Sequence, residues 1–265
     1  MPVIKGLGWT FDTVASAYEK FRPGYAAELY DRIFDYKPIG RSSRLAEIGI
    51  GAGQATLPFL QRGCSLTAVD PGERFAGLCK EKFGNFPGFT AVTGKFEDTE
   101  LESGMYDLVY SASAFHWVPE EIGFTKVFAM LKSGGAFARF ANHPYQDKGR
   151  PALAEEIQEL YAAYYNKFHK VEKSAPREWS EEQAAQRAET AQKYGFKDIE
   201  YALFHRTRTF TAKEYIKLLG TYSDHIVIEE RIRTEFFAKI EEAIERHGGE
   251  ITIYDTMDLQ LARKP

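Results

Sequence analysis

The sequence is poor in cysteine and has no apolar run long enough to cross a membrane. Two cysteines occur among its 265 residues, Cys64 and Cys79, with no Cys-x-x-Cys pair and no His/Cys cluster at zinc-ligand spacing. A disulfide framework and a structural metal are therefore not indicated. The apolar stretches end well before the roughly 20 residues of a membrane-spanning helix, and the first residues contain no hydrophobic signal region. We expect a cytoplasmic protein without a metal.

The sequence also lacks an excess of positive charge. Lysine and arginine number 34 against 38 aspartates and glutamates, which gives a net charge of −4. Proteins that bind DNA or RNA through the phosphates carry a basic excess, so a nucleic-acid partner is not expected. With 44% hydrophobic residues the chain is not globally disordered, and its length suits one large domain or one domain with an insertion.

Short apolar runs alternate with helical patterns in the first half of the chain. Arg22-Pro23-Gly24 separates two N-terminal segments with helical spacing of apolar residues. The strands are expected at residues 44–48, 65–69, 89–92, 106–110 and 136–140, with helices at 55–60, 74–83 and 119–131 between them. Such alternation predicts an α/β fold with a doubly wound, mostly parallel sheet covered on both faces.

The alternation of strand and helix patterns stops after residue 141. Apolar residues at helical spacing predict a long helix over 153–168, and a more polar helix is expected over 180–193. We place an inserted helical lid at 142–196, between an N-terminal half, 1–141, that would bind a cofactor, and the remainder of the sheet with further helices, 197–265. A further candidate segment for the lid is 211–247.

A glycine-rich loop follows the first expected strand. Gly49, Gly51 and Gly53 alternate there, so that the backbone can turn sharply and approach a ligand closely. Asp70 ends the second expected strand, where a carboxylate can accept hydrogen bonds from both hydroxyls of a ribose. Glu47, just before the loop, could meet a positively charged group such as an ammonium. Together these residues predict a nucleoside site.

The loop does not fit a nicotinamide dinucleotide well. That fingerprint requires Gly or Ala at its sixth place, where this chain has Gln54 or Thr56, depending on which glycine is counted first. NAD is therefore disfavoured as the cofactor.

Five segments resemble, in order, the motifs of class I S-adenosylmethionine-dependent methyltransferases. They read Glu47-Ile48-Gly49-Ile50-Gly51-Ala52-Gly53, Ala68-Val69-Asp70-Pro71, Gly94-Lys95-Phe96-Glu97-Asp98, Tyr106-Asp107-Leu108-Val109 and Leu131-Lys132-Ser133-Gly134-Gly135. Residues 17–25 resemble a Y-x-x-x-RP-x-Y segment and 112–117 an A-x-x-HW segment, both typical of the type 11, trans-aconitate-methyltransferase-like group. The resemblance covers residues 10–141 and implies a seven-stranded Rossmann-like fold and S-adenosyl-L-methionine as cofactor.

The resemblance also implies the residues that bind this cofactor. The glycines would line its methionine part, Glu47 would fix its amino end and Asp70 its ribose. The full set is Tyr18, Arg22, Glu47, Gly49, Gly51, Gly53, Asp70, Pro71, Phe96, Glu97 and Ser111. Phe96 and Glu97 would flank the adenine, although Lys95 departs from the acidic residue of the common pattern. Tyr18 is alternatively a core residue, and Arg22 alternatively a cap partner or surface ion pair.

The acceptor side is less defined. His116 follows the fourth expected strand and would act as a general base on a hydroxyl acceptor, or would pack and orient at a corner with Trp117. Residues expected to contact the acceptor are Trp117, His143, Tyr145 and Tyr222. The other histidines, His225 among them, are expected at the surface or at helix ends. Tyrosines at helical spacing, such as Tyr161, indicate either a core or a pocket.

The expected function is methyl transfer to a small-molecule carboxylate or hydroxyl by in-line displacement. The alternative is a methyltransferase-like protein without turnover that binds a ligand or scaffolds a partner. Methylation of nucleic acid is opposed by the charge balance, and the oligomeric state is left open.

Overall fold

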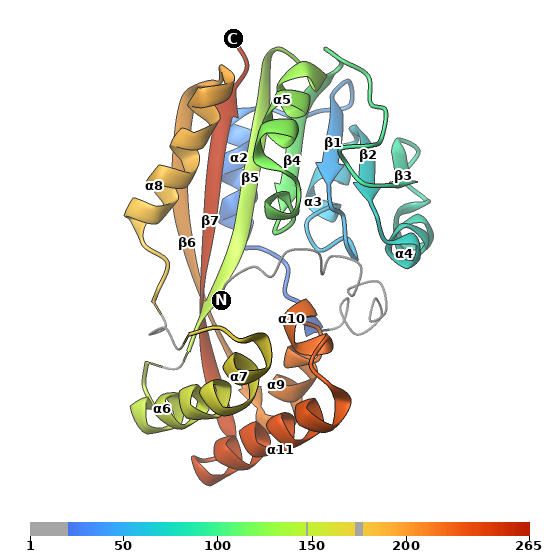
Figure 1. Ribbon diagram of the computed structural model, residues 1–265. Coiled ribbons are helices and arrows are strands. Elements are labelled where there is room, and N and C mark those ends of the chain that lie inside the picture. The colour runs from blue at the N-terminus through green and yellow to red at the C-terminus, as the bar shows by residue number, and fades with distance from the viewer. Residues whose placement is uncertain (1–20, 147, 173–176) are drawn as a thin grey trace. The chain divides into compact units, whose positions relative to one another are not determined.

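Seven strands form one sheet in the part of the chain that the computed structural model describes, residues 21–146, 148–172 and 177–265. The strands are β1 (Arg44–Ile48), β2 (Ser65–Asp70), β3 (Phe89–Thr93), β4 (Tyr106–Ala112), β5 (Leu131–Tyr145), β6 (Lys197–Thr211) and β7 (Glu250–Arg263). Their order across the sheet is β3-β2-β1-β4-β5-β7-β6 (Figure 1). The chain order reverses between β1 and β4, so β1 lies between β2 and β4 in the sheet.

The sheet is mixed, because β7 is antiparallel to the other strands. Strands β1 to β5 pair in parallel, and Glu47 lies opposite Ala68 on one side and Tyr110 on the other. Strand β7 is antiparallel to β5. Lys264, directly after β7, forms hydrogen bonds with Gly134 and Gly135 near the start of β5, whereas the earlier Asp258 accepts one from Ala141 further along β5. The predicted mostly parallel sheet is confirmed, and β5 is longer than its predicted range of 136–140.

Helices connect most of these strands. They are α2 (Ala27–Tyr36), α3 (Leu57–Leu60), α4 (Glu73–Phe83), α5 (Glu120–Met130), α6 (Pro151–Leu160), α7 (Lys167–His169), α8 (Glu181–Glu189), α9 (Ala212–Leu219), α10 (Ser223–Ile226) and α11 (Glu230–Arg246). A π-helix, Tyr161–Asn166, joins α6 to α7. Capping boxes begin α8 at Ser180 and α9 at Thr211. The first predicted N-terminal helix falls on residues outside the described part, apart from its last residue.

The chain divides into two compact units. The sheet unit consists of Pro23–Asn142, Trp179–Phe204 and Met257–Pro265. The helical unit consists of His143–Glu178 and His205–Thr256, with Phe21 and Arg22 as the described residues of its first segment. Segment 211–247, the further candidate for the lid, lies in the helical unit.

The sheet unit buries both faces of its central strands. Successive residues of β1 and β4 alternate between two apolar clusters, so that Leu45 and Tyr110 belong to one cluster and Ala46 and Val109 to the other. Side chains of a strand point alternately to its two faces. These strands are therefore mainly apolar in sequence, without a regular alternation of apolar and polar residues, as strands buried on both sides are.

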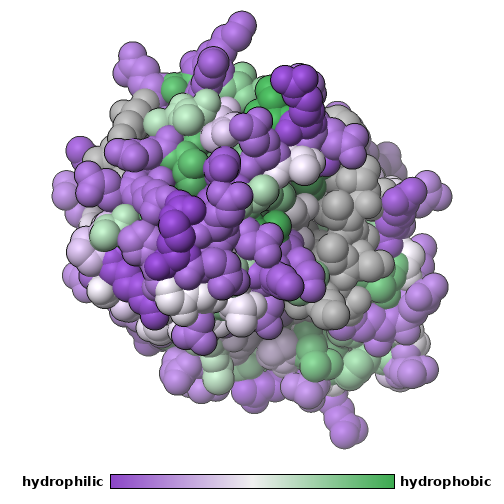
Figure 2. All heavy atoms as spheres, turned by 90° about the horizontal axis from the view of Figure 1, so that it is seen from below, coloured by the Kyte–Doolittle hydropathy of each residue, from purple (hydrophilic) through white to green (hydrophobic). Residues whose placement is uncertain are grey.

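The helical unit has an apolar core of its own. Helix α11 buries Phe236, Ile240, Ala243 and Ile244 at helical spacing, and they pack with residues of α6, α9 and the π-helix. The face of the molecule shown in Figure 2 is mainly hydrophilic, with apolar residues scattered over it. Among the described helices, none combines the length and apolar character needed to cross a bilayer.

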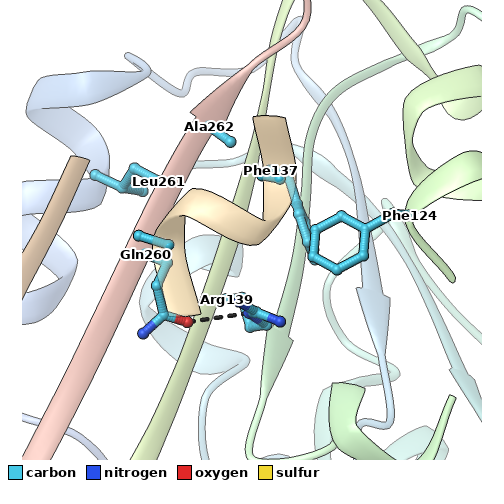
Figure 3. A pocket seen from close by; sticks show the side chains of 8 residues that line it. Phe124, Phe137, Arg139, Gln260, Leu261 and Ala262 are labelled. Atoms are coloured by element: carbon cyan, nitrogen blue, oxygen red, sulfur yellow. Dashed lines mark hydrogen bonds between the residues drawn. The ribbon is translucent and has the colours of Figure 1, made fainter. Parts of the chain in front are cut away.

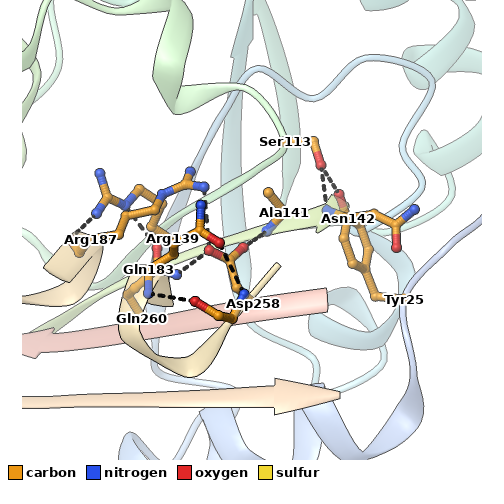
Figure 4. Close-up of polar contacts among 10 residues, drawn as sticks. Tyr25, Ser113, Arg139, Ala141, Asn142, Gln183, Arg187, Asp258 and Gln260 are labelled. Carbon is orange, nitrogen blue, oxygen red and sulfur yellow. Dashed lines mark hydrogen bonds and ion pairs between the residues drawn. The ribbon is translucent and has the colours of Figure 1, made fainter. Parts of the chain in front are cut away.

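Helix α8 belongs to the sheet unit and not to the predicted lid of 142–196. Its buried Ala184 and Ala188 allow close packing, and Ala188 lines a cavity of about 10 Å³ beside Arg139 of β5 (Figure 3). Arg187 of α8 pairs at 3.3 Å with Asp258 of β7, which is fully buried and also accepts a bond from the Ala141 amide (Figure 4). Residues 143–178 thus belong to the helical unit and 179–196 to the sheet unit, and the lid stays a prediction.

Candidate functional site

The glycine loop begins where β1 ends. Gly49, Gly51 and Gly53 have φ angles of 74°, 54° and 75°, in the left-handed region that favours glycine. A Cβ on Gly49 would lie 2.3 Å from the Cβ of Ala114, and one on Gly53 would lie 2.4 Å from the ring of Phe83. Glycine is therefore required for both the turn and the packing of this loop.

Asp70 fastens the loop to the end of β2. Its Oδ2 accepts a hydrogen bond of 2.9 Å from the Gly51 amide, and its Oδ1 accepts one of 2.8 Å from the Gly72 amide. The residue is 7% exposed, and Pro71 beside it is exposed. A carboxylate has about four acceptor positions, and these two bonds to backbone amides orient both oxygens of Asp70. The structure thus brings the predicted loop and the predicted ribose ligand together.

Glu47 is buried beneath the same loop. It is 1% exposed, and its Oε2 accepts hydrogen bonds from Thr56 Oγ1 at 2.8 Å and Tyr110 Oη at 2.7 Å. Its Oε1 is buried and has no hydrogen-bond partner among the described residues. Burial raises the pKa of Glu47 to about 8; the two hydrogen bonds oppose this rise, and the charge of Asp70 adds to it. The loop therefore covers an acid with one unsatisfied oxygen.

The sequence analysis missed both partners of Glu47. The sequence analysis treated Tyr110 as one more apolar residue of a strand. It considered Thr56 only because it does not match the glycine motif of dinucleotide-binding proteins. The register was a usable signal for Tyr110, because Glu47 and Tyr110 lie directly opposite each other on β1 and β4. Tyr110 is held by stacking on Phe59 at a centroid distance of 4.0 Å.

The end of β4 is tied to both of its neighbouring strands. Ser111 is fully buried and donates a hydrogen bond of 2.8 Å to the carbonyl of Ile48, next to the glycine loop. Ser113 has a φ of 53°, and its Oγ shares a hydrogen bond of 2.8 Å with Tyr25 Oη and accepts one from the Asn142 amide (Figure 4). A strained non-glycine residue at this edge is typical of functional sites. Ser113 and Tyr25 were not predicted as site residues.

His116 lies in a short 3-10 helix, Phe115–Trp117, after β4. Its ring is exposed and tilted against the partly buried ring of Trp117, with the centroids 4.9 Å apart. Phe115 instead makes the packed corner, because it is buried against Phe124 and Phe137. His116 is therefore open to solvent at the carboxyl end of a central strand.

Phe96 and Glu97 differ in their surroundings. Phe96 is buried in the apolar cluster that contains Ile48, whereas Glu97 is partly exposed. Lys126 of α5 holds this segment, since its Nζ donates to the carbonyls of both residues and lies 4.8 Å from the centre of the Phe96 ring. The predicted contact of Phe96 with adenine stays a prediction, and Glu97 is the more accessible of the two.

Comparisons with known proteins agree on one activity. The family profile described as "Methyltransferase domain" matches residues 46–138. An uncharacterised methyltransferase of Schizosaccharomyces pombe is 24% identical over 241 residues, which cover 90% of this chain and 88% of that protein. The chain is an S-adenosylmethionine-dependent methyltransferase.

Further similarities concern a curated relative and the fold. A malonyl-[acyl-carrier protein] O-methyltransferase of Ilyobacter polytropus is 28% identical over 133 residues, about 48% of each chain. A putative type II methyltransferase of Anaeromyxobacter dehalogenans has a TM-score of 0.62 at 20% identity, covering 92% of this chain and 98% of its own. A Haemonchus contortus phosphoethanolamine N-methyltransferase in complex with S-adenosyl-L-methionine has a TM-score of 0.55 at 17% identity, covering 96% and 57%. The methyltransferase therefore has the Rossmann-like methyltransferase fold.

Four residues predicted for the site belong to the helical unit of the methyltransferase: Arg22, His143, Tyr145 and Tyr222. Arg22 donates to Thr221 Oγ1 at 3.0 Å and to the Thr221 carbonyl at 3.1 Å, and its guanidinium lies 3.8 Å from the centre of the Tyr222 ring. Burial raises the pKa of Tyr222, and the charge of Arg22 opposes that rise. Their predicted roles toward ligands stay predictions, and Tyr18 lies outside the described residues.

The helical unit also contains a buried polar array that the sequence analysis missed. His225 is fully buried and lies in the last turn of α10, so of the two expected positions the helix end is correct and the surface is not. Its Nδ1 lies 2.9 Å from Asp224 Oδ1 and its Nε2 lies 2.9 Å from Tyr161 Oη, while Tyr165 Oη donates to Asp224 Oδ2 at 2.7 Å. The π-helix supplies both tyrosines. Tyr161 is accordingly a core residue, one of the two alternatives.

Two other kinds of site are not supported in the described part of the methyltransferase. The residues described there include no group of three or more His, Cys, Asp or Glu side chains that could hold a metal ion. The cavity beside Arg139 has room for about one water molecule, so it cannot take a nucleoside (Figure 3).

Proposed function

We propose that the enzyme transfers the methyl group of S-adenosylmethionine to a small-molecule carboxylate or hydroxyl, and that it belongs to the trans-aconitate-methyltransferase-like subgroup. One observation carries the assignment of the site: the glycine loop is fastened to Asp70 and covers the unsatisfied Oε1 of Glu47. An acceptor for ribose hydroxyls and an acid for an ammonium suit the two polar ends of an adenosyl amino acid. The residues present therefore fit the cofactor.

In this proposal, each part of the loop has a separate task. Glu47 would hold the amino end of the cofactor, the glycines and Ser111 would lie along the methionine part, and Asp70 would hold the ribose. When bound, the cofactor supplies a methyl group on a positively charged sulfur, which is a good leaving group. The chain then has to bind, orient and exclude water, and it needs no obligatory nucleophile.

The acceptor decides what His116 does. A hydroxyl acceptor must lose a proton, which an exposed imidazole at the end of β4 can take. A carboxylate is already nucleophilic, and His116 would then only orient it. The name of the Ilyobacter polytropus relative, an O-methyltransferase of malonyl-[acyl-carrier protein], supports a carboxylate. We favour the orienting role, with Trp117 beside His116. The expected acceptor contacts of His143, Tyr145 and Tyr222, which belong to the helical unit, stay predictions.

Methyl transfer from radiolabelled cofactor tests the proposal. The acceptors are small carboxylic acids, phenols and amines, set against tRNA and DNA. We expect turnover on at least one small acid or phenol. Turnover on the nucleic acids alone would overturn the proposal, and cofactor binding without turnover on any acceptor would favour the ligand-binding or scaffold alternative.

A pH–rate profile separates the two roles of His116. For a carboxylate acceptor we expect no limb near the ordinary imidazole pKa of about 6–7, and a loss mainly in KM for His116→Gln. A rate that rises through that pH range in the wild type, and no longer does so in the variant, would show that His116 is the base instead.

A further inference from the structure

We propose that Glu47 recognises the positive charge of the cofactor's amino group by releasing a proton when the cofactor binds. The inference rests on the proposed cofactor site and goes beyond it, because it assigns two protonation states to one residue. Glu47 would be a neutral acid in the free enzyme and a carboxylate in the complex. Binding of the cofactor would then be coupled to the release of one proton to the solvent.

Among the described residues, the groups that interact with Glu47 are hydroxyl groups and one acid, and none of them is a cation. On β4 and after the glycine loop, Tyr110 and Thr56 donate to Oε2. Tyr30 of α2 and Asp70 of β2 are the other titratable groups that interact with Glu47 electrostatically, and neither is positive. An ionised carboxylate that is 99% buried needs a cation or hydrogen bonds on both oxygens. Glu47 has them on one oxygen only.

A proton on Oε1 explains this asymmetry. In the neutral acid, Oε2 is the carbonyl oxygen and accepts both hydrogen bonds, while Oε1 carries the hydrogen. When an ammonium reaches Oε1, the O–H bond breaks, the proton leaves to the buffer, and Oε1 becomes the acceptor of an N–H donor. One proton is released, one ion pair forms, and no other bond changes.

The pKa of Glu47 supports the same sequence of states. Burial raises it to about 8 in the free enzyme, so that the protonated acid predominates at about pH 6.5. A cation in contact with the carboxyl lowers its pKa again. An α-amino group with a pKa of about 7.7–8.0 is itself almost fully protonated at that pH, so it contributes little to the count of protons.

Titration calorimetry measures this proton directly. The demethylated product, S-adenosylhomocysteine, is titrated into the full chain at pH 6.5 in three buffers with different ionisation enthalpies. The slope of the observed heat against the ionisation enthalpy gives the number of protons exchanged. We expect release of nearly one proton for the wild type. Glu47→Gln should release nearly none and bind at least tenfold more weakly, whereas Glu73→Gln, a matched change at an exposed position of α4, should release as many as the wild type.

The possible outcomes keep the two proposals apart. Binding with no proton release in the wild type would overturn the role of Glu47 and leave the cofactor site intact. Release of one proton by Glu47→Gln would place the proton on another group and overturn the role as well. If neither S-adenosylhomocysteine nor S-adenosylmethionine binds, the proposed function is refuted and, with it, this inference.

If Glu47→Gln fails to fold, the infrared difference spectrum of the wild type decides instead. Cofactor binding should remove the carbonyl band of a protonated carboxyl group. The loss of this band in Tyr110→Phe should be no greater than in the wild type. A spectrum without any loss of this band would contradict the inference.

Discussion

Asp70 should have two separable functions, and replacing it tests both. In the structure its two oxygens accept the amides of Gly51 and Gly72, so the side chain supports the glycine loop before any ligand arrives. In the proposed complex the same carboxylate also accepts the ribose hydroxyls. Asp70→Ala should therefore lower both the stability of the free enzyme and its affinity for the cofactor.

The expected magnitudes follow from the contacts. Hydrogen bonds to a charged group contribute about 1.5–3 kcal/mol each, and because the Gly51 amide is partly exposed and can bind water, we expect the two bonds together to contribute about 2–4 kcal/mol to the free energy of unfolding. The lost ribose contacts should weaken binding by about 1.5–3 kcal/mol, or about 10- to 150-fold in Kd. Asp70→Asn keeps one acceptor oxygen and should lie between the wild type and Asp70→Ala in both measurements.

Urea unfolding of the free enzyme measures the first effect and titration calorimetry with S-adenosylhomocysteine the second. Asp31→Ala, an exposed change on α2, is the control and should move neither quantity. An unchanged Kd together with reduced stability would show that Asp70 only supports the loop, and the ribose would have to bind elsewhere. A changed Kd at unchanged stability would refute the supporting role that the two backbone bonds imply.

Two further predictions concern stability. Gly49→Ala should lower the free energy of unfolding by about 2–4 kcal/mol, because its Cβ would lie 2.3 Å from the Cβ of Ala114 and the backbone is left-handed there. Gly40→Ala has open space around it and should be neutral or stabilising by up to about 1 kcal/mol. Urea unfolding of both variants measures these differences. Burial is the largest single influence and would raise the pKa of Asp224, but the hydrogen bonds from His225 and Tyr165 and the charges of His225 and Arg22 together outweigh it and lower the pKa to about 2. This carboxylate therefore contributes about 2 kcal/mol to the free energy of unfolding above about pH 4, and this contribution is lost as the pH falls toward 2. Asp224→Asn should flatten the decrease in urea midpoint between pH 4 and 2, and an equally steep decrease in the variant would contradict the assignment.

The sequence predicted the centre of the sheet well, and for a physical reason. Residues of β1 and β4 alternate between two apolar clusters, so each strand appears in the sequence as a mainly apolar run between turn residues. The glycine loop was equally readable, since Gly49 and Gly53 are required by both backbone angle and packing. Asp70 followed from its place at the end of the neighbouring strand.

The boundary of the helical unit could not be predicted from periodicity. Helix α8 has a polar sequence whose buried residues are alanines, and these give only a weak apolar signal. What attaches it to the sheet unit is polar: Arg187 pairs with Asp258, a residue more than seventy positions away in the chain. A buried ion pair between distant segments leaves no trace in the local pattern of either segment.

The same limit applied to the polar residues inside the cores. His225 and Tyr110 are buried because each has a hydrogen-bond partner, and the partners, Asp224 and Glu47, are recognisable only once the chain is folded. For Asp224 and His225 the two residues are adjacent in sequence, yet their burial depends on Tyr161 of the π-helix. Sequence reasoning therefore located the glycine loop but missed the hydrogen-bond partners of the buried acids Glu47 and Asp224.

The two acids of the glycine loop show why their partners matter for function. Asp70 accepts two backbone amides, and hydrogen bonds of this kind favour the charged form of a carboxyl group. Its negative charge in turn raises the pKa of Glu47, whose own hydrogen bonds reach one oxygen only. Two ionised carboxyls this close are disfavoured unless a cation joins them. A ligand with hydroxyls at one end and an ammonium at the other would satisfy both acids, whereas an adenosyl compound without the amino group would leave Glu47 neutral and should bind without releasing a proton.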